Sequence, residues 1–110
     1  MNGELWDWLY SRGVIQVRAY STAKALDCMS RCQFDGVITN LRRMENGRQN
    51  LQAGIELVQN VRRIHPGLPI AIYTMNIDSA TRNAALHAGA NLITISPDEL
   101  KQWLVTFVGV

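Results

Sequence analysis

The sequence predicts a single α/β domain of three layers, in which helices cover both faces of a parallel sheet. Segments with the 3.6-residue period of helices alternate with short apolar segments of strand length throughout residues 1–110. The apolar run Leu68–Thr74 is unbroken, which is typical of a parallel strand buried on both faces. No linker or repeat divides the 110 residues, and a chain of this length can bury one core.

Helices are expected where apolar residues at helical spacing lie between capping signals. The first helix ends at Gly13, the second begins at the capping residue Ser21, and the last follows the start signal Ser96-Pro97-Asp98-Glu99. The expected helices span residues 4–12, 21–32, 51–65, 78–88 and 97–107.

Four strands are expected between these helices. Val14–Ala19 alternates in β fashion, and Gly36–Leu41, Leu68–Thr74 and Leu92–Ile95 are apolar. Residues 42–50 are expected to form a polar loop that contains Gly47. Because crossover connections are right-handed, the order αβαβαβαβα predicts a parallel sheet between two layers of helices.

Composition excludes several kinds of partner. Eleven Lys and Arg residues against nine Asp and Glu give a net charge of +2, too small to predict direct nucleic-acid binding. The chain has neither a leader pattern nor a run of about 18 apolar residues, so we expect a cytoplasmic protein that does not enter a membrane. Cys28 and Cys32 lack a second ligand pair, which predicts no metal site; they form either a reduced pair or a redox pair.

The polar end of the second strand is the first candidate site. Asn40 lies where that strand ends, and ligands of open α/β sheets bind beyond the carboxyl ends of the strands. Arg42, Arg43 and Arg48 follow it, and they form either an anion or nucleotide site or an ordinary solvated loop. The two histidines, His65 and His87, have no predicted catalytic partner, so no enzymatic activity is expected.

Four segments resemble response-regulator receiver domains, in the family's order: residues 13–29 (GVIQVRAYSTAKALDCM), 35–41 (DGVITNL), 53–74 (AGIELVQNVRRIHPGLPIAIYT) and 84–100 (AALHAGANLITISPDEL). The resemblance covers nearly the whole chain and implies a flavodoxin-like fold. It also implies an activity, the transfer of a phosphoryl group to an aspartate beside Mg²⁺, an acidic pair, a hydroxyl residue and a lysine.

Most of that machinery is replaced in this sequence. Asn40 stands at the position of the phosphoacceptor, and Ser96 stands at that of the lysine. Thr74 keeps the hydroxyl, while Met75 replaces a small residue and would crowd the pocket, and Ile93 replaces a Tyr or Phe. A carboxamide is a poor nucleophile and a weak Mg²⁺ ligand, so we expect neither phosphoryl transfer nor a cofactor.

The acidic pair has no counterpart, because the sequence begins after the strand that would carry it. That strand is an interior one in the receiver sheet, which leaves four strands expected here. The neighbouring strands close up, or a strand from a second copy or another protein fills the gap, or Met1 is not the natural start.

The two terminal helices carry three tryptophans. Trp6 and Trp103, together with Ile93, are candidates for a protein interface, and the alternative is that the tryptophans pack the first helix against the last. The sequence therefore predicts a pseudo-receiver that binds a protein partner or a second copy, as a homodimer, in bacterial signalling or regulation. The alternative is a sensor of a nucleotide or another small anion that uses the basic loop.

Overall fold

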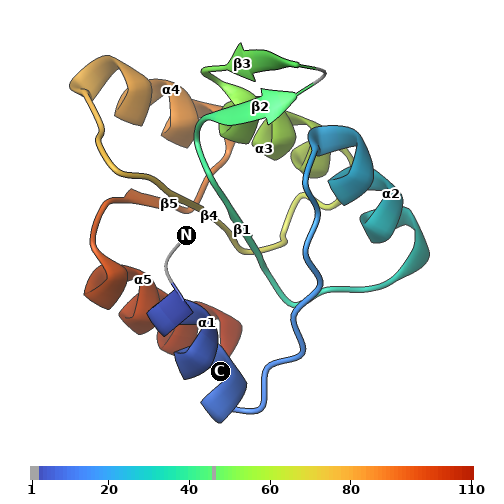
Figure 1. Ribbon diagram of the computed structural model, residues 1–110, viewed down its shortest axis with the longest axis vertical. Helices are drawn as coiled ribbons and strands as arrows, with labels where there is room; N and C mark the ends of the chain where they lie inside the picture. Colours follow the sequence, from blue (N-terminus) through green and yellow to red (C-terminus); the bar gives the residue numbers. More distant parts are fainter. Residues whose placement is uncertain (1–2, 46) are drawn as a thin grey trace.

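The computed structural model describes residues 3–45 and 47–110, and the side chains at positions 43, 45 and 48 lie outside that description (Figure 1). The elements are α1 (Gly3–Ser11), α2 (Thr22–Arg31), β1 (Val37–Thr39), β2 (Arg43–Glu45), β3 (Arg48–Asn50), α3 (Ala53–Ile64), β4 (Ile70–Tyr73), α4 (Ser79–Ala88), β5 (Leu92–Thr94), α5 (Pro97–Trp103) and a π-helical turn, η1 (Leu104–Val108).

A parallel sheet with the strand order β1-β4-β5 forms the middle layer. In Figure 1, α1 and α5 lie on one side of this sheet, and α2, α3 and α4 lie on the other. The predicted three-layer α/β/α architecture with a parallel sheet is therefore confirmed.

The central strand β4 shows why both faces need helices. Ile70 and Ile72 are fully buried in the cluster beneath α2, α3 and α4, whereas Ala71 between them is buried in the cluster beneath α1 and α5. Successive side chains of a strand point to opposite faces, so one continuous apolar run supplies two cores. The smaller core contains Leu5, Leu9, Ala71, Leu100, Trp103 and Leu104.

Local capping chemistry fixes the helix ends close to their predicted positions. Ser21 accepts a hydrogen bond from the Lys24 N–H at 3.1 Å, and Ser96 accepts one from the Glu99 N–H at 3.2 Å. Gly89 ends α4 with a φ of 117°, in the left-handed region that favours glycine.

The predicted strand Val14–Ala19 does not form. Among the residues that the structure describes, this segment pairs with no strand, and the parallel sheet has three strands where four were expected. It is tied instead to α1: the Val14 N–H donates to the Leu9 carbonyl at 3.1 Å, and Gln16 Nε2 donates to the Trp6 carbonyl at 3.2 Å. The neighbouring strands therefore do not close up into a four-stranded sheet.

The expected polar loop at 42–50 is also corrected, because it contains an antiparallel hairpin. β2 pairs with β3 through the register Arg43↔Asn50, Met44↔Gln49 and Glu45↔Arg48. Gly47 has a φ of 75°, which suits a glycine in a tight turn, and residue 46 lies outside the described residues. Figure 1 shows this hairpin beside the start of α3.

Candidate functional site

The carboxyl ends of β1 and β4 open onto a hollow of about 350 Å³, here called the strand-end hollow. Parallel strands end at the same edge of a sheet, so polar residues that follow them are brought together. Its lining consists of Asn40, Leu41, Arg42, Tyr73, Thr74, Met75 and Asn76. Three of the four residues predicted for the degenerate pocket, Asn40, Thr74 and Met75, therefore meet here.

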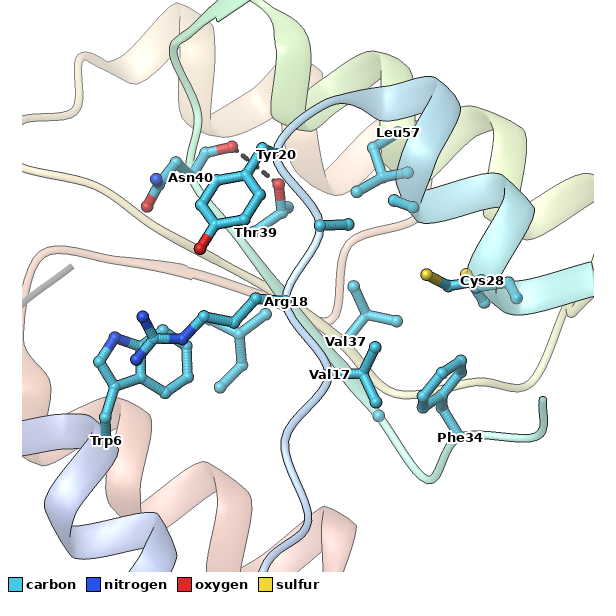
Figure 2. A pocket seen from close by; sticks show the side chains of 15 residues that line it. Trp6, Val17, Arg18, Tyr20, Cys28, Phe34, Val37, Thr39, Asn40 and Leu57 are labelled. Carbon is cyan, nitrogen blue, oxygen red and sulfur yellow. Dashed lines mark hydrogen bonds between the residues drawn. The ribbon is translucent and has the colours of Figure 1, made fainter. Parts of the chain in front are cut away.

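Asn40 is exposed, and among the described residues its carboxamide has no hydrogen-bond partner. Its backbone carbonyl accepts a hydrogen bond from Thr39 Oγ1 at 3.0 Å, as Figure 2 shows. Thr39 itself is 4% exposed. The strand end is thus held by a buried hydroxyl, while the Asn40 side chain stays available at the surface.

Thr74 and Met75 continue from β4 into the loop before α4. The Thr74 N–H donates to the Thr94 carbonyl at 3.1 Å, which extends the pairing of β4 with β5 by one residue. Met75 was expected to crowd the pocket. It is 91% exposed, so its side chain lies largely in solvent and does not fill the hollow.

Ser96 does not line the strand-end hollow. Its side chain caps α5, and its N–H donates to Thr94 Oγ1 at 3.0 Å. Because the hydroxyl is used at the helix start, Ser96 supplies neither a charge nor a donor where a receiver domain would have a lysine.

Of the three arginines of the predicted anion site, Arg42 alone has a side chain within the described part of the chain. Arg42 is half-buried and lines the strand-end hollow. The side chains of Arg43 and Arg48 lie outside the part of the chain that the structure describes, so the anion site stays a prediction.

Asp78 begins α4 and is the acidic residue whose pKa is influenced by the charge of Arg42. The Thr81 N–H, which donates to its carboxylate at 2.7 Å, holds the pKa of Asp78 below its ordinary 3.8, and the positive charge of Arg42 acts in the same direction. The lowered pKa belongs to an N-cap, since Asp78 begins α4.

Acid is therefore expected to weaken the fold partly through Asp78. A carboxyl whose pKa is lower in the folded state stabilises that state above its unfolded pKa, and this contribution is lost as the pH falls through the folded pKa. We expect Asp78→Asn to flatten the decline in the free energy of unfolding between about pH 4 and pH 2. Urea unfolding of both proteins across this range measures it, and parallel curves would contradict the assignment.

The three predicted interface residues do not share a surface. Ile93 is 1% exposed and Trp103 is 8% exposed, so both belong to the interior of the described chain. Trp6 is half-buried, and the Arg18 guanidinium stacks on its ring, 4.8 Å from the centroid.

A second hollow, of about 370 Å³, lies on the other side of Asn40, between β1 and the extended segment 17–20 (Figure 2). We call it the β1 groove. Its lining consists of Trp6, Val17, Arg18, Ala19, Tyr20, Ala25, Cys28, Met29, Phe34, Gly36, Val37, Ile38, Thr39, Asn40 and Leu57. Arg18 and Tyr20 are not among the site residues predicted from the sequence: Arg18 lies in the predicted strand Val14–Ala19, and Tyr20 lies between that strand and the helix predicted from residue 21.

Searches against protein-family models and against curated proteins find no match. Solved structures do match. A protein of Chloroflexus aurantiacus described as a response regulator has a TM-score of 0.77 and 25% identity, over 97% of this chain and 88% of its own. A two-component response regulator of Clostridium difficile has a TM-score of 0.80 and 17% identity, over 96% and 84% of the two chains.

The receiver domain of a sensor histidine kinase of Pseudomonas aeruginosa also matches, with a TM-score of 0.75 and 20% identity, over 97% and 87% of the two chains. That structure holds a magnesium ion in its active-site cleft. The present chain thus has the fold of response-regulator receiver domains, a class of signalling domain, and the resemblance expected from its sequence is confirmed.

The described residues include no group of three or more His, Cys, Asp or Glu side chains placed to hold a metal ion. Cys28 and Cys32 are both free. In the described ranges, no helix has the length and apolar character that a membrane span requires.

Proposed function

We propose that this chain is a receiver-like signalling domain that does not accept a phosphoryl group and that acts by binding another protein. The observation that carries this proposal is Asn40. It lies at the end of β1, where the resemblance places the phosphoacceptor aspartate, and it offers an exposed, neutral carboxamide.

The chemistry of the strand-end hollow supports the first half of the proposal. Phosphoryl transfer needs a carboxylate nucleophile, and it needs positive charge on the transferring oxygens. The described lining offers Arg42 but no carboxylate, and Ser96 is occupied as a helix cap. A hydroxyl at Thr74 alone cannot replace a metal held by acidic ligands.

Exposed apolar side chains support the second half. Tyr10, Ile15 and Tyr20 are 81%, 92% and 78% exposed, and they lie within eleven residues of the sequence. Exposed large side chains of this kind are available for contact with a partner protein. A binding role is therefore better supported here than catalysis.

The alternative, a sensor of a small anion, has less support. Arg42 is the one charged side chain in the described lining of the strand-end hollow, and its charge also acts on Asp78.

Restoring the carboxylate tests the proposal. We expect Asn40→Asp to remain unlabelled by acetyl phosphate in the presence of Mg²⁺, because the acidic pair and the lysine would still be absent. Intact-mass spectrometry of this variant, beside the unchanged protein and a receiver domain with a complete site, measures the result. Stoichiometric, Mg²⁺-dependent labelling of Asn40→Asp would contradict the proposal.

A further inference from the structure

The β1 strand has an open edge. β1 pairs with β4 and, among the described residues, with no other strand. The Val37 N–H donates to the Pro69 carbonyl at 2.9 Å, so Val37 and Thr39 direct their peptide groups towards β4. Successive residues of a strand direct their N–H and C=O groups to opposite sides, which points those of Ile38 into the β1 groove.

The opposite wall of the groove is a strand-like segment without a ladder. Residues 14–19 pair with no strand in the described part of the chain, and contacts with α1 hold them in place. Figure 2 shows Val17 and Arg18 on the segment that passes in front of β1. Two stretches of extended backbone thus border one hollow of about 370 Å³.

The shape and chemistry of the groove suit a peptide. Its floor is largely apolar, with Met29, Phe34, Val37 and Leu57 among its residues. An open strand edge is satisfied by the N–H and C=O groups of an added strand, which also places every second side chain on the apolar floor. A compact small molecule offers neither this repeat of donors and acceptors nor the extended form.

Charge selects the kind of peptide. Of the described residues that line the groove, Arg18 alone is charged, and its exposed guanidinium lies over Trp6. The strand-like segment of a second copy, residues 14–19, has Arg18 and no acidic residue. Insertion of that segment would bring two arginines together, so a second copy is a poor occupant.

We propose that the β1 groove accepts an extended segment of a partner protein, which pairs with β1 through Ile38, places apolar side chains on the floor and presents an acidic side chain to Arg18. This inference rests on the proposed role in protein binding. It adds the location of the contact, its strand-addition geometry and the charge of the partner.

Three synthetic octapeptides test the inference. The first alternates valine and threonine and ends in two aspartates. The second ends in two lysines, and the third has the first sequence with N-methylated central residues that cannot pair with a strand. Backbone NMR of the full chain records shifts and amide hydrogen exchange. We expect the first peptide to slow exchange at the Ile38 N–H by at least about tenfold, and we expect the third to leave it unchanged.

Charge reversal at Arg18 is the second part of this test. We expect Arg18→Glu to weaken binding of the aspartate peptide by about tenfold and to favour the lysine peptide. Arg63→Glu is the matched control, since Arg63 is exposed on α3 and lines neither hollow; it should bind as the unchanged chain does. Circular dichroism of both variants establishes that they are folded.

The outcomes separate this inference from the proposed function. No protection at Ile38, protection by the N-methylated peptide, or equal binding of the two charged peptides would overturn the inference. So would a dimer, seen by light scattering, in which Ile38 is already protected without peptide. Labelling of Asn40→Asp by acetyl phosphate would overturn the proposed function and would leave the peptide result unaffected.

Discussion

Replacing Arg62 by alanine is expected to lower the free energy of unfolding by about 2–4 kcal/mol. Arg62 lies near the end of α3, and its guanidinium joins parts of the chain that are distant in sequence. Nε donates to the Gly89 carbonyl at 2.8 Å, Nη1 to the Leu68 carbonyl at 2.5 Å, and Nη2 to Asn91 Oδ1 at 2.8 Å. One side chain therefore links α3 to the starts of β4 and β5 and to the end of α4.

The large effect follows from what alanine would leave behind. Nη1 also donates to the carbonyls of His65 and Pro66, at 3.3 and 3.1 Å. Arg62 is half-buried, so its guanidinium gives up part of its hydration, and this burial lowers the pKa of Arg62 from its ordinary value. Truncation would leave several carbonyls without their donor, and an unmade hydrogen bond costs more than a made one contributes.

Two control variants make the measurement specific. Arg63→Ala removes the adjacent arginine, whose described hydrogen bond is to Asn60, and should change stability by less than about 0.5 kcal/mol. Arg62→Lys keeps the charge but loses the planar fork of donors, so it should fall between the other two. Urea unfolding measures all three. Equal midpoints for Arg62→Ala and Arg63→Ala would contradict the role assigned to Arg62.

The helix ends were predictable because capping is chemistry between residues three or four apart. Ser21, Asp78 and Ser96 each accept a hydrogen bond from an N–H three residues later. No distant part of the chain decides whether such a contact forms. The π-helical turn at the end of the chain, where the Gly109 N–H donates to the Leu104 carbonyl, has no comparable local signal.

Strand pairing was less predictable, because a strand needs a neighbour. Val14–Ala19 has the alternation of a strand, but alternation reports side-chain pattern and not the presence of a pairing edge. The β2–β3 hairpin had a usable local signal. Asn46-Gly47 is a dipeptide strongly favoured in two-residue hairpin turns, although the polar composition of residues 42–50 by itself predicts only a loop.

Some parts of the candidate site could likewise be predicted from the sequence, and others could not. Asn40 and Thr74 were expected together because both follow parallel strands, and the strand-end hollow contains both. Ser96 carried two predictions, a helix cap and a pocket residue, and the structure uses its hydroxyl for the cap. The β1 groove depends on a strand edge that remains open, which no local pattern in the sequence could predict.

Replacing Gly54 by alanine is expected to destabilise the protein by about 1–2 kcal/mol net and to disturb Asn40. Gly54 is the second residue of α3, and its N–H donates to the Leu41 carbonyl at 2.9 Å. An added Cβ would collide with the carbonyl oxygen of Asn40 and would lie 3.0 Å from the Leu41 Cα. These are backbone atoms, which cannot rotate out of the way as a side chain can.

Two opposing effects decide the result at Gly54. Alanine favours helix by up to about 1 kcal/mol relative to glycine, whereas inserting a methyl group against fixed backbone costs about 1–3 kcal/mol or more. The steric cost is expected to exceed the gain, because the Asn40 carbonyl is already held by Thr39 Oγ1 at 3.0 Å. Moving that carbonyl would weaken this bond and shift the residue that carries the proposed function.

Gly3→Ala is the matched control, because Gly3 also lies in the first turn of a helix and an added Cβ there meets no atom of the described residues within 4 Å. It should leave stability unchanged or raise it by less than about 1 kcal/mol. Urea unfolding separates the two variants, and amide chemical shifts of Thr39 and Asn40 should move in Gly54→Ala alone. If Gly54→Ala were as stable as Gly3→Ala and left those shifts unchanged, α3 would not be packed against the end of β1 as described, and the position of Asn40 would need another explanation.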